Sequence, residues 1–218
     1  MLLSSAGCPL VASVRATLLA GLVLAGGREV DAADTTYTLD KARSSLVIHV
    51  GKAGLFSFAG HEHVVTAQKL EGQILAAADD LSRSRLTLTF ATAGLRVEEQ
   101  GEPAGDAVKV QEAMVGPRVL DATRFPTVTF KSKIVTGKAS SAGVYDLDIT
   151  GDLSLHGVTG SLAMPLRVEV SGDELKASGH LGLRQTDYGI SPVSVAGVVK
   201  VKNGLAIDYT FVATKALH

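Results

Sequence analysis

The feature that most constrains the fold is a strict alternation of apolar and polar residues along most of the chain. Between Tyr145 and His156 the odd positions are mainly apolar, whereas the even positions include Asp146, Asp148 and Asp152. Because successive side chains of a β-strand point to opposite faces, this pattern predicts a strand with one buried and one wet face. The same alternation recurs at 86–90, 128–130, 162–170 and 205–211. It is typical of antiparallel sheets.

Turn signals separate these segments and indicate roughly eight to ten strands. They include His156-Gly157 and Asn203-Gly204, and the second pair is close to the pattern favoured in a two-residue hairpin. One short helix is expected over 107–115. A long antiparallel meander tends to close on itself, because closure removes exposed sheet edges. We therefore expect one all-β domain, a closed barrel of about eight strands with one or two short helices.

Residues 1–32 have the layout of a secretory signal that is removed. Arg15 precedes the run ATLLAGLVLAGG, which is too short to span a bilayer. Val30 and Ala32 then suit a cleavage site, so the mature domain is expected to be 33–218. An uncleaved membrane anchor is the alternative interpretation.

The residue content narrows the compartment and the class of partner. The sole cysteine, Cys8, lies in the segment to be removed, so the mature chain would hold no thiol. This suits export to a bacterial periplasm and excludes disulfides and cysteine chemistry. The formal charge is −1, and no run of lysines and arginines occurs, which argues against nucleic-acid binding. Aromatic residues make up 5% of the chain, so a barrel must be filled with aliphatic side chains or left partly open.

Four motifs, in this order, resemble the YceI-like family of exported bacterial proteins. They are YTLDKARSSLVIHV (37–50), DATRFPTVTFKS (121–132), GDLSLHGVTGSLAMPL (151–166) and LRQTDYGISPVSVAGVVKVKNGLAIDYTF (183–211). The resemblance covers about residues 35–214. It implies an extended, lipocalin-like antiparallel β-barrel. It also implies an apolar tunnel that holds a polyisoprenoid chain, such as an isoprenoid quinone or a prenyl phosphate.

The implied function is therefore periplasmic binding or carriage of an apolar lipid, without catalysis. Under this hypothesis the partners are the isoprenoid lipid and, transiently, a membrane or a membrane redox protein; a homodimer is a further hypothesis. Inward-facing apolar side chains would line the tunnel, and an ordinary packed core is the alternative role for each of them. Our candidates for the lining are Leu46, Ile48, Leu88, Phe130, Leu153, Leu155 and Tyr188.

The stretch AGHEHVV (59–65) is the clearest candidate for other chemistry. If it forms a strand, His61 and His63 point to the same face with Cα atoms roughly 6.5 Å apart, and Glu62 points to the other. Two imidazoles so placed can share a metal ion with a third ligand. The candidates for that third ligand are His49, His156 and His180.

Three roles for this histidine pair follow from the sequence. A metal site would make the protein a metal-binding protein or a metal-dependent enzyme, which is the alternative to lipid binding. Histidines at the rim of the barrel would instead contact a ligand's head group, or serve the fold alone. The His-x-His-x-Asp-His pattern of one class of metalloenzyme is broken, because Val65 and Thr66 follow where aspartate and histidine are needed. The sequence holds no nucleophile elbow and no phosphate-binding loop.

Overall fold

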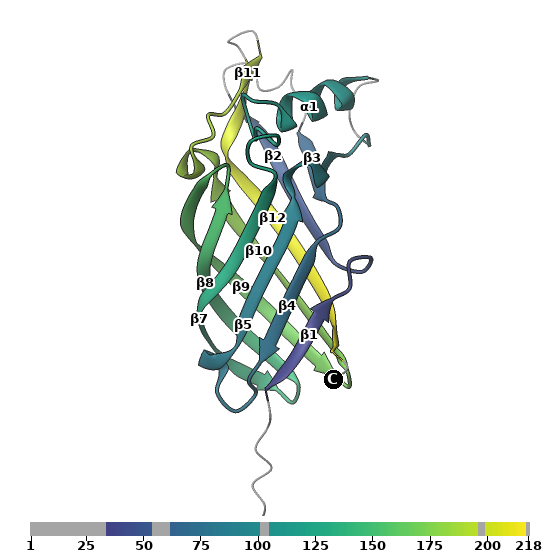
Figure 1. Ribbon diagram of the computed structural model, residues 1–218, viewed down its shortest axis with the longest axis vertical. Coiled ribbons are helices and arrows are strands. Elements are labelled where there is room, and N and C mark those ends of the chain that lie inside the picture. Colours follow the sequence, from purple (N-terminus) through teal and green to yellow (C-terminus); the bar gives the residue numbers. More distant parts are fainter. Residues whose placement is uncertain (1–33, 54–61, 101–104, 196–198, 217–218) are drawn as a thin grey trace, which may run out of the picture. The chain divides into compact units, whose positions relative to one another are not determined.

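The computed structural model describes residues 34–53, 62–100, 105–195 and 199–216 (Figure 1). The expected signal segment lies outside these ranges. The strands are β1 (Thr35–Leu39), β2 (Ser45–Ala53), β3 (His63–Ala67), β4 (Glu71–Ala76), β5 (Arg85–Ala91), β6 (Leu95–Val97), β7 (Thr127–Ser141), β8 (Val144–Leu155), β9 (Val158–Ser171), β10 (Glu174–Arg184), β11 (Ser194–Val195) and β12 (Val199–Lys215). The helices are α1 (Asp106–Val115) and the 3₁₀ turns η2 (Leu81–Arg83), η3 (Thr92–Gly94) and η4 (Gln185–Tyr188).

Eight of these strands close into an antiparallel barrel. Their order around the barrel is β1, β4, β5, β7, β8, β9, β10 and β12, and β12 pairs with β1 to complete the circle. Closure leaves no free edge among these eight strands, so their backbone donors and acceptors are satisfied within the wall. The prediction of a closed all-β barrel of about eight strands is confirmed.

The long strand β12 makes the barrel taller at one end. Its residues 213–215 pair with β1, whereas its residues 200–210 pair with β2. Strand β2 continues the wall through β3 to β6. We call the end formed by β2, β3, β6 and α1 the upper half, and the end formed by β1, β4 and η2 the lower half (Figure 1).

Helix α1 covers the outer edge of β6, where the wall would otherwise expose unpaired backbone groups. The side-chain oxygen of Gln111 accepts a hydrogen bond from the Val97 amide at 2.8 Å, and its side-chain nitrogen donates to the Leu95 carbonyl at 2.9 Å. The two hydrogen bonds of Gln111 thus take the place of those that a neighbouring strand would make to Leu95 and Val97. The predicted helix over 107–115 is confirmed as α1, Asp106–Val115. Among the described residues, no helix combines the length and the apolar character needed to cross a bilayer.

The two turns singled out in the sequence have different outcomes. His156 and Gly157 both have positive φ, 52° and 74°, and join β8 to β9 as a two-residue hairpin. The expected hairpin at Asn203-Gly204 is wrong, because β12 runs through both residues with only a register shift against β2. The Asn203 side chain accepts from the Thr186 amide at 3.0 Å and donates to the Thr186 hydroxyl at 2.9 Å. These bonds hold Asn203 against η4, so β12 continues through Asn203 and Gly204 instead of turning there.

Side chains fill much of the lower half. Leu86, Val135, Ile149 and Phe211 are all at most 5% exposed there. Partly buried side chains face the interior in both halves, among them Leu46 and Leu155 in the upper half and Ile74 and Leu147 in the lower half. The halves differ in the space that they enclose, which is about 530 Å³ in the upper half and about 140 Å³ in the lower half.

Gly179 on β10 faces the interior beside the ring of Tyr209, and it gives a test of this packing. A Cβ at Gly179 would lie 2.7 Å from the Tyr209 ring and would also clash with the Pro165 carbonyl oxygen. We expect Gly179→Ala to lower the free energy of unfolding by about 1–3 kcal/mol, as measured by urea denaturation. The matched control is Gly182→Ala on the same strand, whose Cβ would meet only the Leu205 carbonyl at 3.9 Å. Equal stabilities of the two variants would contradict this account of the packing.

Candidate functional site

The upper half of the barrel encloses a cavity of about 530 Å³. Its wall is built by inward-facing residues of β2, β3, β5, β6, β7, β8, β9, β10 and β12, and α1 covers one side. Leu, Ile, Val, Phe and Met side chains dominate this wall. A site of this size and character lies in the range of natural ligand pockets, which are mostly apolar with a few polar groups.

Six of the seven residues predicted as lining lie in the wall of this cavity. They are Leu46, Ile48, Leu88, Phe130, Leu153 and Leu155. Tyr188 lies elsewhere: it belongs to η4, is 3% exposed, and its ring sits against Gly160 of β9 without lining the cavity. Contact of any of the seven with a ligand stays a prediction.

Sequence reasoning missed the contribution of α1 and of the last strand. Val110 and Met114 of α1 face the cavity, and their spacing of four residues is the signal that marks one side of a helix. Ile207 and Tyr209 of β12 also line it. Their alternation was visible in the sequence, but alternation alone does not separate a cavity wall from a packed core.

A few polar side chains lie in the same wall. Lys109 and Asp106, at the start of α1, form an ion pair at 3.1 Å, and the Lys109 side chain is 78% exposed. His63 lines the cavity from β3 and is partly buried. Because Lys109 is largely solvated, the polar side chains at the start of α1 mark the mouth of the cavity, where it meets solvent.

Apart from the tyrosine hydroxyl of Tyr209, Gln185 is the most buried polar group in this wall, at 7% exposure. Its side-chain nitrogen donates to the Lys202 carbonyl at 2.8 Å. A carbonyl oxygen only accepts hydrogen bonds, so this contact fixes which end of the amide is the nitrogen. The Gln185 side-chain oxygen has no donor among the described residues. A buried acceptor without a donor costs free energy, so a donor on a bound molecule would be stabilised there.

The predicted metal pair is described only in part. His61 lies outside the described residues, and His63 faces the cavity. His49 points the opposite way, because Val50 pairs with His63 and His49 pairs with Val64. His49 is therefore not placed to share a metal ion with His63.

The other histidines considered as third ligands also have positions away from His63. His180 and His49 both bind the carboxylate of Asp208 on the outer face, at 2.8 and 3.0 Å. The hydrogen bond from His180, followed by that from His49, holds the pKa of the Asp208 carboxyl below its ordinary value. The His156 ring contacts Phe125 edge-on. Within the described ranges, no group of three or more His, Cys, Asp and Glu residues is arranged to hold a metal ion.

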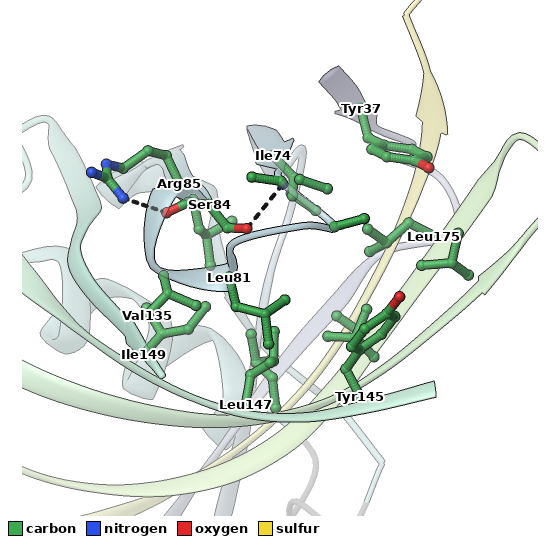
Figure 2. A pocket seen from close by; sticks show the side chains of 18 of the residues that line it. Tyr37, Ile74, Leu81, Ser84, Arg85, Val135, Tyr145, Leu147, Ile149 and Leu175 are labelled. Atoms are coloured by element: carbon green, nitrogen blue, oxygen red, sulfur yellow. Dashed lines mark hydrogen bonds between the residues drawn. The ribbon is translucent and has the colours of Figure 1, made fainter. Parts of the chain in front are cut away.

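A smaller cavity of about 140 Å³ lies in the lower half (Figure 2). Leu81 of η2 points into it between Leu147 and Val135, and the Ser84 hydroxyl accepts a hydrogen bond from the Ala77 amide at 3.1 Å beside it. Tyr37 and the other lining residues are again mainly apolar. The turn between β4 and β5, which contains η2, therefore covers the lower end of the barrel interior.

The fold and the site together define a class: a closed antiparallel β-barrel that encloses an apolar cavity. Residues 37–213 match the family model described as the YceI-like domain. The chain therefore belongs to the YceI-like domain family, as its motifs predicted. The comparison with curated proteins finds no match.

Solved structures with this fold come from several bacteria. BcnA of Burkholderia cenocepacia is 18% identical, with a TM-score of 0.63 over 81% of this chain and 99% of that one. A polyisoprenoid binding domain from Saccharophagus degradans, implicated in plant cell wall breakdown, is 16% identical, with a TM-score of 0.58 over 84% and 99%. The YCEI protein of Campylobacter jejuni is 14% identical, with a TM-score of 0.52 over 71% and 85%. These likenesses establish the shared fold.

The metal hypothesis has a direct test. If His61 and His63 hold a zinc, copper or iron ion, purified protein is expected to contain that metal in stoichiometric amount, because imidazoles bind these ions tightly. The double variant His61→Ala/His63→Ala should then lose it, whereas His49→Ala/His180→Ala on the outer face should retain it. Elemental analysis provides the measurement. The same trace of metal in all three proteins would end the hypothesis.

Proposed function

We propose that this protein binds and carries a polyisoprenoid or similar apolar lipid, held inside the upper half of the barrel. The observation that carries the proposal is the apolar cavity of about 530 Å³ enclosed by the strands of the upper half and by α1. Membership of the YceI-like family supports it, and so does the fold shared with a polyisoprenoid binding domain. The ligand class that fits is an isoprenoid quinone or a prenyl phosphate.

The energetics of such binding rest on removing hydrocarbon from water. Each Å² of apolar surface buried contributes about 25 cal/mol, so a tail that buries about 400 Å² gains about 10 kcal/mol before association costs. A cavity already shaped by a hydrogen-bonded barrel needs little rearrangement to accept the tail. Binding energy is therefore not spent on ordering the protein.

The polar residues favour one orientation of the ligand. Lys109 supplies donors near the mouth, where His63 also lines the wall, and Gln185 supplies a buried acceptor. Below them the wall is hydrocarbon. We infer that the polar head of the lipid lies near α1 and that its tail points toward the lower half.

Carriage rather than catalysis is the role that this wall supports, because it offers a ligand mainly dispersion contacts. We further propose that the protein is exported to the periplasm after loss of residues 1–32. A lipid insoluble in water must be taken from and returned to a membrane, so transient contact with a membrane surface or a membrane redox protein belongs to the same proposal.

The export proposal predicts a defined N-terminus. When the full chain is expressed in a Gram-negative bacterium, the periplasmic fraction is expected to contain a protein that begins at Ala33, because small residues at Val30 and Ala32 suit the signal peptidase. Intact-mass measurement gives the N-terminus directly. An intact chain that stays with the membrane fraction would support the anchor interpretation instead.

The binding proposal predicts that protein purified from bacterial cells without detergent carries an extractable lipid. Solvent extraction and mass spectrometry should find an isoprenoid in the wild type. Leu155→Trp places a large ring in the cavity and should reduce the extracted lipid about tenfold or more, because the ring occupies the space of the tail.

The matched control for this experiment is Ile134→Trp. Ile134 is 59% exposed on β7, so the same ring is added outside the cavity and the lipid content should not change. Thermal unfolding confirms that each variant is folded. If fresh wild-type protein carries no lipid and also takes up no prenyl alcohol offered in excess, the proposed function is wrong.

A further inference from the structure

We propose that a layer of aromatic side chains across the middle of the barrel sets the length of hydrocarbon chain that the upper cavity accepts. We call this layer the waist; it consists of Tyr209 and Phe211 on β12 and Phe130 on β7. The inference rests on the proposed lipid binding and adds to it a rule for which lipids fit best.

The waist lies where one cavity ends and the other begins. On β12, Tyr209 lines the upper cavity and Phe211 lines the lower one. On β5, Leu88 lines the upper cavity and Leu86 lines the lower one. Residues two apart on a strand face the same side and are separated by about 6.6 Å, so the boundary between the two spaces falls between two successive layers of the wall, with Tyr209 on the upper side and Phe211 on the lower side. No residue is common to the two linings.

The rings of the waist are held in place by more than packing. Tyr209 and Phe211 are stacked, with ring centroids 5.4 Å apart and planes 10° from parallel. The Tyr209 hydroxyl donates to the Pro165 carbonyl on β9 at 2.6 Å. Burial raises the pKa of this hydroxyl above its ordinary value, so it remains a donor. Phe211 is fully buried.

Two glycines provide the space that these rings occupy. A Cβ at Gly179 would lie 2.7 Å from the Tyr209 ring, and a Cβ at Gly151 would lie 2.7 Å from the Phe130 ring. Both positions are therefore kept free of a side chain beneath a ring, a pairing known to stabilise glycine within sheets. The waist is part of how the wall is built, and a tail that reaches it cannot push it aside at low cost.

The position of the waist sets the depth of the upper cavity, and therefore the length of tail that the cavity can hold. Val201 and Tyr209 both line the upper cavity and are eight residues apart on β12. At about 3.3 Å per residue and a strand tilt of about 40°, this corresponds to about 20 Å along the barrel axis. A tail longer than this depth must leave its remainder outside the cavity, in water or in another protein or membrane.

The test is a series of all-trans prenyl alcohols that differ by one isoprene unit, with affinity measured by displacement of an apolar fluorescent dye. For the wild type, affinity should rise with each unit while the tail still gains buried length, since each CH₂ contributes a factor of about four at most. It should stop rising once the tail reaches the waist. The break in this series is the quantity to compare between variants.

Two variants should move the break in opposite directions. Tyr209→Ala removes the ring that ends the upper cavity and deepens that cavity by one layer of side chains, so the break should move to longer alcohols. Ile207→Phe adds a ring one layer above Tyr209, so the break should move to shorter ones. Tyr209→Phe keeps the ring and loses only the hydroxyl, and its break should match that of the wild type.

The outcomes separate two claims: that the protein binds prenyl lipids, and that the waist sets the length of the tail. If the wild type binds no prenyl alcohol of any length, the proposed function fails and this inference fails with it. If the wild type binds them but Tyr209→Ala, shown to be folded, keeps its break, the waist does not set the length and only this inference is overturned. If Tyr209→Ala does not fold, Tyr209→Leu, which also removes the ring, takes its place.

Discussion

The pairing of β12 with β10 on one side and with β1 and β2 on the other closes the sheet, and the rest of the structure depends on that closure. In most small domains, side chains must fill the interior, because the packed core holds the layers together. In a closed barrel, the backbone ladder itself holds the wall. The ladder closes through β1 in the lower half, and α1 covers the edge of β6 in the upper half, so the upper interior can hold a cavity without an exposed sheet edge.

The lower half of the barrel contributes mainly to stability, and the upper half provides the space for a ligand. The lower half, where Phe211, Val135 and Leu86 are buried, has the character of an ordinary core. The upper half encloses the larger cavity, and side chains that line a cavity lack packing partners on one side. A bound hydrocarbon would restore those contacts, so a ligand that fits should also raise the protein's stability. Lys109, His63 and Gln185, at the open end, give such a ligand a direction.

Much of the fold could be predicted from the sequence, because a period of two is a local signal. The alternation from Tyr145 to His156 became β8, and the short apolar segment after residue 106 became α1. The hairpin expected at Asn203-Gly204 did not form. The dipeptide suits a turn locally, but Thr186 of η4 binds the Asn203 side chain and Arg184 of β10 pairs with Gly204, and a local turn signal does not include these partners.

The site was predictable only as a set of inward positions. Leu88 and Phe130 were placed on the inner face by alternation, and they do line the cavity. Sequence could not show that the larger cavity lies in the upper half, because both halves use the same residue types. Nor could it show the roles of Gln111 and Gln185, whose partners are backbone groups of distant strands. Tyr188 was assigned to the inner wall, but the turn that carries it turns its ring to Gly160.

A crystal structure of the protein, purified from bacterial cells without detergent or organic solvent, tests the central claim most directly. The account predicts continuous, elongated electron density inside the upper half, beginning near Lys109 and Gln185 and ending at the ring of Tyr209. Side chains of opposite walls that meet throughout the upper half, with no space between them for a chain, would contradict it.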